Sequence, residues 1–494
     1  MGRDVAAVAI TKEDRRRYRE KVRRCLEALA AMLRDGRFED DRASIGMEVE
    51  LNLVDENGLP AMLNAAVLES IADPGAWATE LAQFNIEINL PPGSLAGKAL
   101  AMLEQRIRDN LNHADGRART VGAELMMIGI LPTLRESDVS EATLSANPRY
   151  RLLNEQVLAA RGENLPLEIE GVELLRTSSD CIAPEAACTS VQFHLQVGPG
   201  DFAASWNAAQ AIAGVQVALG ANSPYLFGRE LWRETRLPLF EQSTDTRSEE
   251  LKAQGVRPRV WFGERWIDSA YDLFEENSRY FSALLPMCED EEPVEALARG
   301  EIPELAEMAL HNGTIYRWNR PVYAVVDGRP HLRVENRVLP AGPTVADIMA
   351  NAAFYYGLVR ALAEEERPIW ERMSFAAAAD NARRGARFGL DARVYWPGTG
   401  EVPVTGLVLE HLLPLAVTGL DRWGVDTVVR DRLLGIIEQR CVTGRNGATW
   451  QVETVRAASA AGADRAEALR LMTRRYVEHM HTNAPVHTWP VGEG

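Results

Sequence analysis

The sequence lacks a long uninterrupted apolar run. Of its 494 residues 46% are hydrophobic, yet no segment reaches the roughly 18 consecutive apolar residues that a membrane helix needs. Even the apolar stretch 208–221 carries Gln210 and Gln216. The N-terminal segment is charged instead of basic and then apolar, so we expect no secretory signal. These features predict a cytoplasmic protein that does not bind a membrane.

Cysteine and lysine are both scarce. The five cysteines are scattered and show no CxxC spacing, which argues against a disulfide framework and against a zinc site. Only four of the 54 basic residues are lysines, so a phosphate-binding loop has few places for its lysine. The segment most similar to that motif, residues 93–98, is one residue too short and lacks the Ser or Thr of the motif. The net charge of −17, without a basic stretch interleaved with aromatics, argues against nucleic acid as a partner.

The chain divides into three regions by pattern. Residues 13–35 place apolar side chains at helical spacing among charges, which predicts an amphipathic helix. In residues 43–340, short segments of alternating apolar and polar residues are broken by Asn-Gly, Pro-Gly and Asp-Gly pairs. This pattern is typical of a sheet with intervening helices. Residues 344–480 predict mainly helix, with segments at 345–366, 407–420, 427–439 and 454–479. No repeat or low-complexity linker interrupts residues 1–494, so we expect a single catalytic domain of the α+β class.

Four predicted strands, at 45–53, 83–90, 190–197 and 331–338, carry their polar residues on one face. Side chains of a strand alternate between its two faces, so residues of one parity share a face. These polar sets are Glu48, Glu50 and Asn52; Gln83, Asn85, Glu87 and Asn89; Gln192, His194 and Gln196; and Arg333, Glu335 and Arg337. A single such strand most simply has a solvated face. Four together, rich in Glu, Gln, Asn, His and Arg, favour a shared binding site.

The residue types on these faces indicate phosphate chemistry. Four carboxylates are candidate ligands for magnesium: Glu48, Glu50, Glu87 and Glu335. Hard divalent cations prefer such oxygen ligands. Arg333 and Arg337 suit a transferring phosphoryl group, whose developing charge needs both a metal and a guanidinium. The pattern predicts a nucleotide site without a phosphate-binding loop.

The motif from Gly46 to Leu51 resembles the GxExE strand of glutamate-cysteine ligases, in particular the bacterial family 2 carboxylate-amine ligases. Further segments resemble that family in the same order. They are 85–92, the second acidic strand; 189–194, a strand ending in histidine; 221–229, an Ala-Asn-Ser-Pro loop followed by Arg236; 334–337, a Glu-x-Arg strand; and 444–451, a Gly-Ala-x-Trp-Gln loop. The resemblance covers about residues 45 to 451.

The resemblance implies a glutamine-synthetase-like fold, in which a curved antiparallel sheet forms a funnel with helices packed outside. ATP and two or three magnesium ions would enter one end and the amino acid the other. It implies roles for the following residues: Glu48, Glu50, Glu87 and Glu335 as metal ligands; Gln192, His194 and Arg333 near the nucleotide; Arg337, with Glu50 and Glu335, in catalysis; and Arg236 at a substrate carboxylate. The expected partners are a small amino-acid donor and an amine acceptor.

Several assignments stay open at this point. Arg229 and Arg247 compete with Arg236 for the substrate carboxylate, because residues 230–235 depart from the family pattern; Arg229 and Arg236 could instead form salt bridges with nearby glutamates. Residues 316–320 either pack or line a substrate pocket. Residues 445–451 form either a turn after a helix or a loop that covers the active site.

The expected reaction is ATP-dependent ligation. A carboxylate, by resemblance the γ-carboxylate of glutamate, attacks the γ-phosphate of ATP, and an amine then displaces phosphate from the acyl phosphate. The resemblance favours cysteine as the amine. Two alternatives remain: a related ligase with another donor or acceptor, and a non-catalytic protein that binds a nucleotide or an amino acid. The retained carboxylates argue against the second alternative, since a protein without catalysis has no need for costly converging acids.

Overall fold

The four polar strands are neighbours in one antiparallel sheet. The computed structural model describes residues 10–39, 44–73 and 75–492. Its main sheet has the order β12-β13-β7-β1-β3-β2, with β4 paired to β1. The strands are β1 Ile45–Val54, β2 Trp77–Thr79, β3 Asn85–Gly93, β4 Glu124–Met126, β7 Ser190–Val197, β12 Asn319–Val326 and β13 Arg329–Pro340. The expected strands correspond to β1, β3, β7 and β13, although β3 begins only at Asn85, and the α+β class is confirmed.

The register of the sheet aligns the polar side chains across neighbouring strands. Glu50 on β1 lies opposite Glu87 on β3, and Glu48 lies opposite Gln192 on β7. On the other side of β7, His194 pairs with Glu335 on β13. Because paired residues point to the same face, the polar sets predicted strand by strand form one continuous surface.

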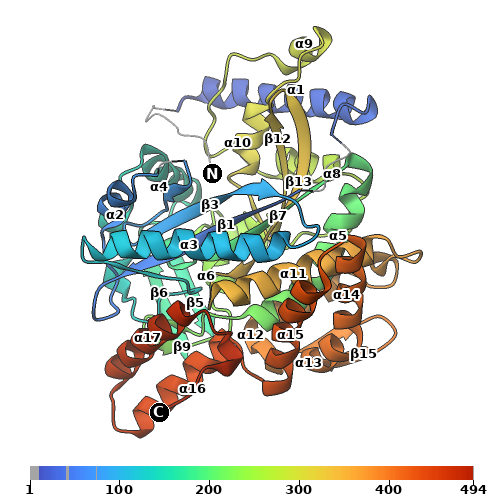
Figure 1. Ribbon diagram of the computed structural model, residues 1–494. Helices are drawn as coiled ribbons and strands as arrows, with labels where there is room; N and C mark the ends of the chain where they lie inside the picture. Colours follow the sequence, from blue (N-terminus) through green and yellow to red (C-terminus); the bar gives the residue numbers. More distant parts are fainter. Residues whose placement is uncertain (1–9, 40–43, 74, 493–494) are drawn as a thin grey trace.

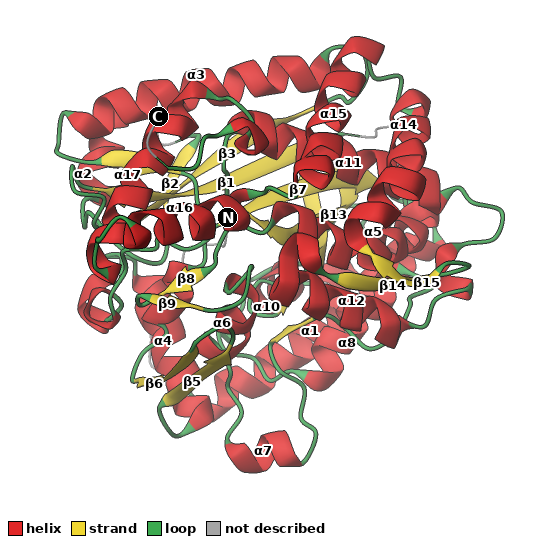
Figure 2. Ribbon diagram, turned by 90° about the horizontal axis from the view of Figure 1, so that it is seen from below, coloured by secondary structure: helices red, strands yellow, loops and turns green. Residues whose placement is uncertain are grey.

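The opposite face of the sheet is apolar and covered by helices. Its side chains, such as Met47, Val49 and Phe193, are almost completely buried. The Phe193 ring lies 6.0 Å from the rings of Tyr355 and Tyr356 on the helix α11. The covering helices are α3 Ala99–Arg119, α5 Pro199–Gly220 and α11 Val345–Ala363. Figures 1 and 2 show the curled sheet enclosed by these helices.

The N-terminal helix is present as expected. Helix α1 (Lys12–Arg34) begins at a capping box between Thr11 and Asp14 and buries one face. It packs against α8 Ala270–Tyr280, α9 Pro293–Ala298 and α10 Ala306–Asn312. This helix stabilises the end of the molecule that carries the β12-β13 hairpin (Figure 1).

The C-terminal region is helical but differs from the expectation in two places. The predicted helix 454–479 is two helices, α16 Gly447–Ala460 and α17 Arg465–Thr482. Gly462 has φ +106°, which ends helical geometry, and Asp464 caps the second helix by accepting from the Glu467 N–H. The region also contains α12 Phe375–Phe388 and the hairpin of β14 Arg393–Trp396 and β15 Gly400–Pro403.

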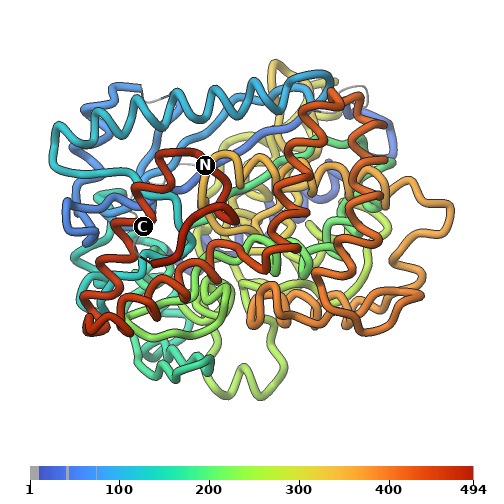
Figure 3. Tube along the Cα trace, turned by 60° about the horizontal axis from the view of Figure 1, so that its bottom comes forward, coloured from blue at the N-terminus to red at the C-terminus, as the bar shows by residue number. Residues whose placement is uncertain are grey.

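Helices α14 Leu413–Arg422 and α15 Thr427–Thr443 pack on α11 and lie close to the N-terminal half of the chain. The Gly97 N–H donates to the Gly424 carbonyl at 2.8 Å. Figure 3 shows the orange and red C-terminal segments beside the blue and cyan ones. Segments from both halves of the sequence therefore contact each other; the single catalytic domain stays a prediction.

One helical segment among the described residues, Val404–Arg422, is long and apolar enough to cross a membrane by length and composition. Its buried side chains include Val408, Leu412, Ala416 and Leu420. A Cβ placed on Gly419 would lie 1.8 Å from the Gly357 carbonyl oxygen of α11. This close backbone contact makes the segment part of the folded core.

Candidate active site

A cavity of about 670 Å³ opens on the polar face of the sheet. Its lining combines three kinds of side chain. The acids are Glu48, Glu50, Glu69, Asp73, Glu80, Glu87 and Glu185; the cations are Arg149, Arg236, Arg320 and Arg337; the aromatic residues are Trp77, Tyr150, Phe240, Tyr316 and Trp318. Alternate residues of the segment 316–320 thus line the cavity, as one of the two open interpretations expected.

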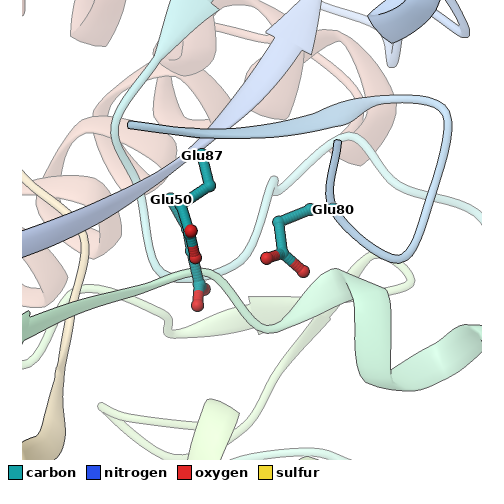
Figure 4. Close-up of side chains that lie close together, drawn as sticks. All are labelled: Glu50, Glu80 and Glu87. Carbon is teal, nitrogen blue, oxygen red and sulfur yellow. The ribbon is translucent and has the colours of Figure 1, made fainter. Parts of the chain in front are cut away.

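Three carboxylates converge at one side of this cavity. Oxygens of Glu50, Glu80 and Glu87 lie within 4.8 Å of one another. Figure 4 shows Glu50 and Glu87 projecting from adjacent strands while Glu80 faces them from the segment after β2. Burial and the charge of Glu48 raise the pKa of Glu87 to about 7. Burial and the charge of Glu87 raise the pKa of Glu80 well above its usual value. Such acids can all ionise together only when a cation balances them.

Neighbouring side chains hold the acids of this cluster in place. Glu50 accepts from the Ser190 N–H at 2.6 Å and from the Gln192 amide at 2.8 Å. Glu87 accepts from the Asn89 amide at 2.7 Å. Burial raises the pKa of Glu50. Both oxygens of Glu50 and one oxygen of Glu87 thus accept hydrogen bonds, and these contacts orient the two carboxylates as outer contacts do for metal ligands.

Glu335 lies apart from this cluster. Its carboxylate accepts three contacts of 2.9 to 3.1 Å from Arg320 and a further one from Arg337. Burial alone would raise the pKa of Glu335, yet the charges of Arg320 and Arg337 hold it well below its usual value. The structure thus places this expected metal ligand in an ion-paired group. Its role at the metal remains a prediction.

Arg337 occupies an irregularity in the sheet. The register between β13 and β7 shifts after Asn336 and resumes at Leu339, so Arg337 and Val338 together oppose Gln192. Arg337 donates to the side chains of Gln192 and Glu335. Such a bulge redirects a side chain, and here it brings a guanidinium to the cavity beside the acids.

Arg236 holds this bulge. Its side chain is buried, and its Nε donates to Glu234 at 2.9 Å. Its two terminal nitrogens donate to the carbonyls of Arg337, at 3.5 Å, and Val338, at 2.5 Å. The expected ion pair with Glu234 therefore forms, and three of the five N–H groups of Arg236 contact protein.

The two competing arginines lie outside the cavity. Arg229 is exposed on the short strand β9 (Arg229–Glu230). Arg247 is paired with Asp245 through contacts of 2.8 and 2.9 Å and donates to the Val256 carbonyl. Neither residue lines the cavity that contains the acids. The chain folds both arginines onto other surfaces, and their assignment to a substrate carboxylate stays an untested prediction.

A second group of polar side chains lies further along β7 and β13. His194 Nε2 lies 3.2 Å from Glu48, and His194 Nδ1, Gln196 Nε2 and Arg333 Nε are buried without a hydrogen-bond partner among the described residues. Burial would raise the pKa of Glu48, but the hydrogen bond and charge of His194 lower it to about 2. Buried polar nitrogens without partners are rare, and a bound ligand or water is one explanation for them.

The segment 444–451 forms a turn and not a covering loop. Gly444 ends α15 with φ +64°, and Asn446 caps α16. Gln451 donates to the Asn222 side chain at 2.8 Å, and Asn222 donates to the Ala341 carbonyl. The two family motifs at 221–229 and 444–451 thus bind each other behind the sheet.

Sequence reasoning missed Glu80, Glu185 and Arg149. Glu80 follows the short strand β2, and Glu185 lies on the 3₁₀ helix η3 (Ala183–Ala187), so neither shows strand alternation. Arg320 carried a stronger signal. Asp327 and Gly328 both have positive φ, as a two-residue hairpin turn requires, and counting outward from that turn pairs Arg320 with Glu335.

A curled antiparallel sheet with a cavity of carboxylates and arginines on its polar face is the architecture of carboxylate-amine ligases. The chain belongs to glutamate-cysteine ligase family 2 (GCS2), whose family model matches residues 44–479. This family consists of ATP-dependent carboxylate-amine ligases. Among curated protein sequences, none matches the chain.

Three solved structures are similar to the chain at low sequence identity. The glutamate-cysteine ligase of Francisella tularensis, in complex with AMP, is 12% identical, with a TM-score of 0.56 and 90% of each chain covered. A bifunctional glutathione synthetase from Pasteurella multocida is 13% identical, with a TM-score of 0.45, over 92% of this chain and 54% of that one. The Pup ligase PafA, in complex with Pup, is 8% identical, with a TM-score of 0.39, over 89% and 72%. The first comparison supports the fold.

Proposed function

We propose that this protein is an ATP- and magnesium-dependent ligase that joins an amino-acid carboxylate to an amine through an acyl phosphate. Glutamate is the leading donor and cysteine the leading acceptor. The observation that carries the proposal is the cluster of Glu50, Glu80 and Glu87 beside Arg337 in one cavity. Membership of the family supports the reaction class, whereas the substrate pair follows from resemblance.

The acidic cluster fits magnesium. Its donors are all carboxylate oxygens, which suit a hard cation and not zinc or copper. The raised pKa of Glu87, about 7, reflects its burial and the like charges of Glu48 and Glu50. Glu50, Glu80 and Glu87 would hold the ion, with Glu48 as a further candidate and Glu335 as the more distant one. Bound magnesium would neutralise the phosphate charge of ATP.

The buried nitrogens of His194 and Arg333, which lack partners among the described residues, support a nucleotide at that end of the sheet. ATP phosphates would accept from the Arg333 Nε–H. Gln192 would act indirectly, because its amide binds Glu50 and its carbonyl oxygen accepts from Arg337. It would thereby connect the metal ligands to the phosphoryl-binding guanidinium.

The first chemical step would take place beside Arg337. A donor carboxylate oxygen attacks the γ-phosphorus, the bond to the ADP oxygen breaks, and ADP leaves. Glu335 and Gln192 hold the guanidinium of Arg337, so its charge is oriented before the transition state forms. The two remaining N–H groups of Arg236 could bind the donor's α-carboxylate. An amine then attacks the acyl carbon and releases phosphate.

Phosphate release tests the proposal. Purified protein is incubated with ATP, Mg²⁺, each of a panel of amino-acid donors and each of a panel of amines, and ADP, phosphate and the amide product are quantified together. Equal amounts of ADP, phosphate and a γ-glutamyl amide are expected, fastest with cysteine. Faster release with another donor or amine would replace the substrate pair and keep the ligase class. ATP binding without phosphate release under any combination would favour the non-catalytic alternative.

A further inference from the structure

Glu185 is a carboxylate in the cavity whose role the contacts described above leave unassigned. It lies on η3, between β6 (Leu174–Ser179) and β7, and it lines the cavity. Its Oε2 is buried and has no hydrogen-bond partner among the described residues. Glu50 and Glu87 differ in this respect, because each accepts hydrogen bonds that fix its orientation.

A buried carboxylate oxygen without a partner is costly to keep, since it loses hydration without gaining a hydrogen bond. Residues of this kind concentrate at functional sites. A structural explanation would need a cation or a donor that binds Oε2, and the described part of the chain supplies neither. Glu185 is therefore better explained by a group on a substrate.

Glu185 lies close to both the charged and the aromatic parts of the cavity, because η3 packs on α6 (Arg236–Ser243), the helix that carries Arg236 and Phe240. Burial raises its pKa to about 8, while the charge of Arg337 lowers it and that of Glu50 raises it. The charge of Glu185 in turn contributes to the raised pKa of Tyr316, after burial. Tyr316 packs edge-on against Phe240 at 5.0 Å between ring centroids. An amine seated on these rings would face both Glu185 and the reacting centre near Arg337.

We propose that Glu185 is the general base that removes a proton from the ammonium group of the acceptor. This assignment rests on the proposed function. The acceptor enters as an ammonium, and one N–H proton moves to a carboxylate oxygen of Glu185. The freed nitrogen lone pair attacks the acyl carbon, and the carbon–oxygen bond to phosphate breaks with its electron pair on the phosphate oxygen. The second surplus N–H proton leaves with the phosphate, and Glu185 returns its proton to solvent.

The substrate class follows from this role. The acceptor is an amine that is protonated at neutral pH, such as the α-amino group of an amino acid, and its side chain faces the rings of Phe240 and Tyr316. Hydroxylamine is largely unprotonated at neutral pH and needs no such base. It also traps an acyl phosphate as a hydroxamate, so it reports the first step independently of Glu185.

The test compares Glu185→Gln with the wild type using three nucleophiles: cysteine, methylamine and hydroxylamine, each with ATP, Mg²⁺ and glutamate. Turnover with cysteine and methylamine is expected to fall by roughly a hundredfold or more, while hydroxamate formation stays within about threefold of the wild type. The control is Glu241→Gln, which replaces another buried carboxylate whose pKa is raised to about 7 but which lines a different cavity. It should leave all three rates unchanged.

Each other outcome overturns the assignment. An equal loss with all three nucleophiles would make Glu185 a structural or first-step residue, and undiminished turnover with cysteine and methylamine would show that another group takes the proton. In both cases the proposed function survives, because the wild type still forms the hydroxamate. No hydroxamate from the wild type would overturn the proposed function, and the base assignment with it. A cooperative thermal transition of Glu185→Gln, at the wild-type midpoint, excludes misfolding as the cause of a loss.

Discussion

The acidic cluster and the ion-paired Glu335 differ in how their charge is balanced. Within the described part of the chain, no guanidinium is bound to Glu50, Glu80 or Glu87, and burial raises the pKa values of all three. Glu335 is enclosed by Arg320 and Arg337, which hold its pKa low. The cluster is therefore a candidate site for a cation, whereas the charge of Glu335 is already neutralised. Position on a strand face thus decides where an acid points, and its neighbours decide what it can bind.

The largest expected effect comes from removing a charge in the unbalanced cluster. Glu50→Gln should lower the turnover rate roughly a thousandfold, because the metal loses a ligand. This loss corresponds to about 4 kcal/mol in the activation free energy. The same change should alter the free energy of unfolding without metal only slightly, because the loss of one like charge offsets the loss of one of the two hydrogen bonds that Glu50 accepts. Steady-state ATP turnover and chemical denaturation measure the two effects. Near-wild-type turnover at limiting Mg²⁺ would refute the metal assignment.

Removing the charge of Glu335, in contrast, should lower the stability of the protein. Glu335→Gln leaves Arg320 and Arg337 without their counterion in a buried site, so the free energy of unfolding should fall by on the order of 3 kcal/mol. Turnover should fall as well, because Arg337 loses its orientation. Denaturation of both variants at one pH checks the contrast. If the two variants lost equal stability, the distinction between balanced and unbalanced acids would not hold.

Arg337 lies between the acidic cluster and Glu335, so Arg337→Lys tests the role of its guanidinium. Lysine keeps the charge but loses the planar fork, so we expect a loss of about 3 kcal/mol, or roughly a hundredfold, in kcat with little change in ATP affinity. The matched control is Arg176→Lys, an exposed residue paired with Glu168 on the β5-β6 hairpin, where β5 spans Leu165–Glu170. An increase in KM for ATP with unchanged kcat would instead make Arg337 a ground-state binder.

The smallest expected effect is a pH dependence of stability without metal. The pKa of Glu87 is raised to about 7, so folding favours its protonated form. Its contribution to the free energy of unfolding is therefore fully present below its unfolded pKa of about 4.3 and is lost as pH rises toward 7, by on the order of 2 to 3 kcal/mol. Glu87→Gln should remove this part of the pH dependence. Thermal melts between pH 5 and 8, with and without Mg²⁺, measure this dependence. Magnesium should restore the stability of the wild type at the higher pH. Identical pH profiles for the wild type and Glu87→Gln would show that Glu87 does not titrate as the acidic cluster predicts.

Strand alternation predicted much of the site because it is a local property. Glu48, Glu50 and Glu87 share a parity within their own segments, and the sheet preserves that parity when strands pair. The helical periodicity of residues 13–35 likewise predicted α1, whose apolar stripe needs only a partner surface. The family motifs, which occur in the family's order along the chain, assigned a role to each strand. The family match over residues 44–479 confirms the resemblance.

Other features depended on contacts between distant segments. Glu80 and Glu185 come from irregular segments, and only the folding of those segments onto the sheet brings them to the cavity. Arg229 and Arg247 looked equivalent to Arg236 in the sequence, yet only Arg236 reaches the carbonyls of the bulge. The sequence by itself determined the strands, their polar faces and the family. The tertiary structure alone decided which acids stay unbalanced, because charge balance in a buried site depends on side chains that arrive from separate parts of the chain.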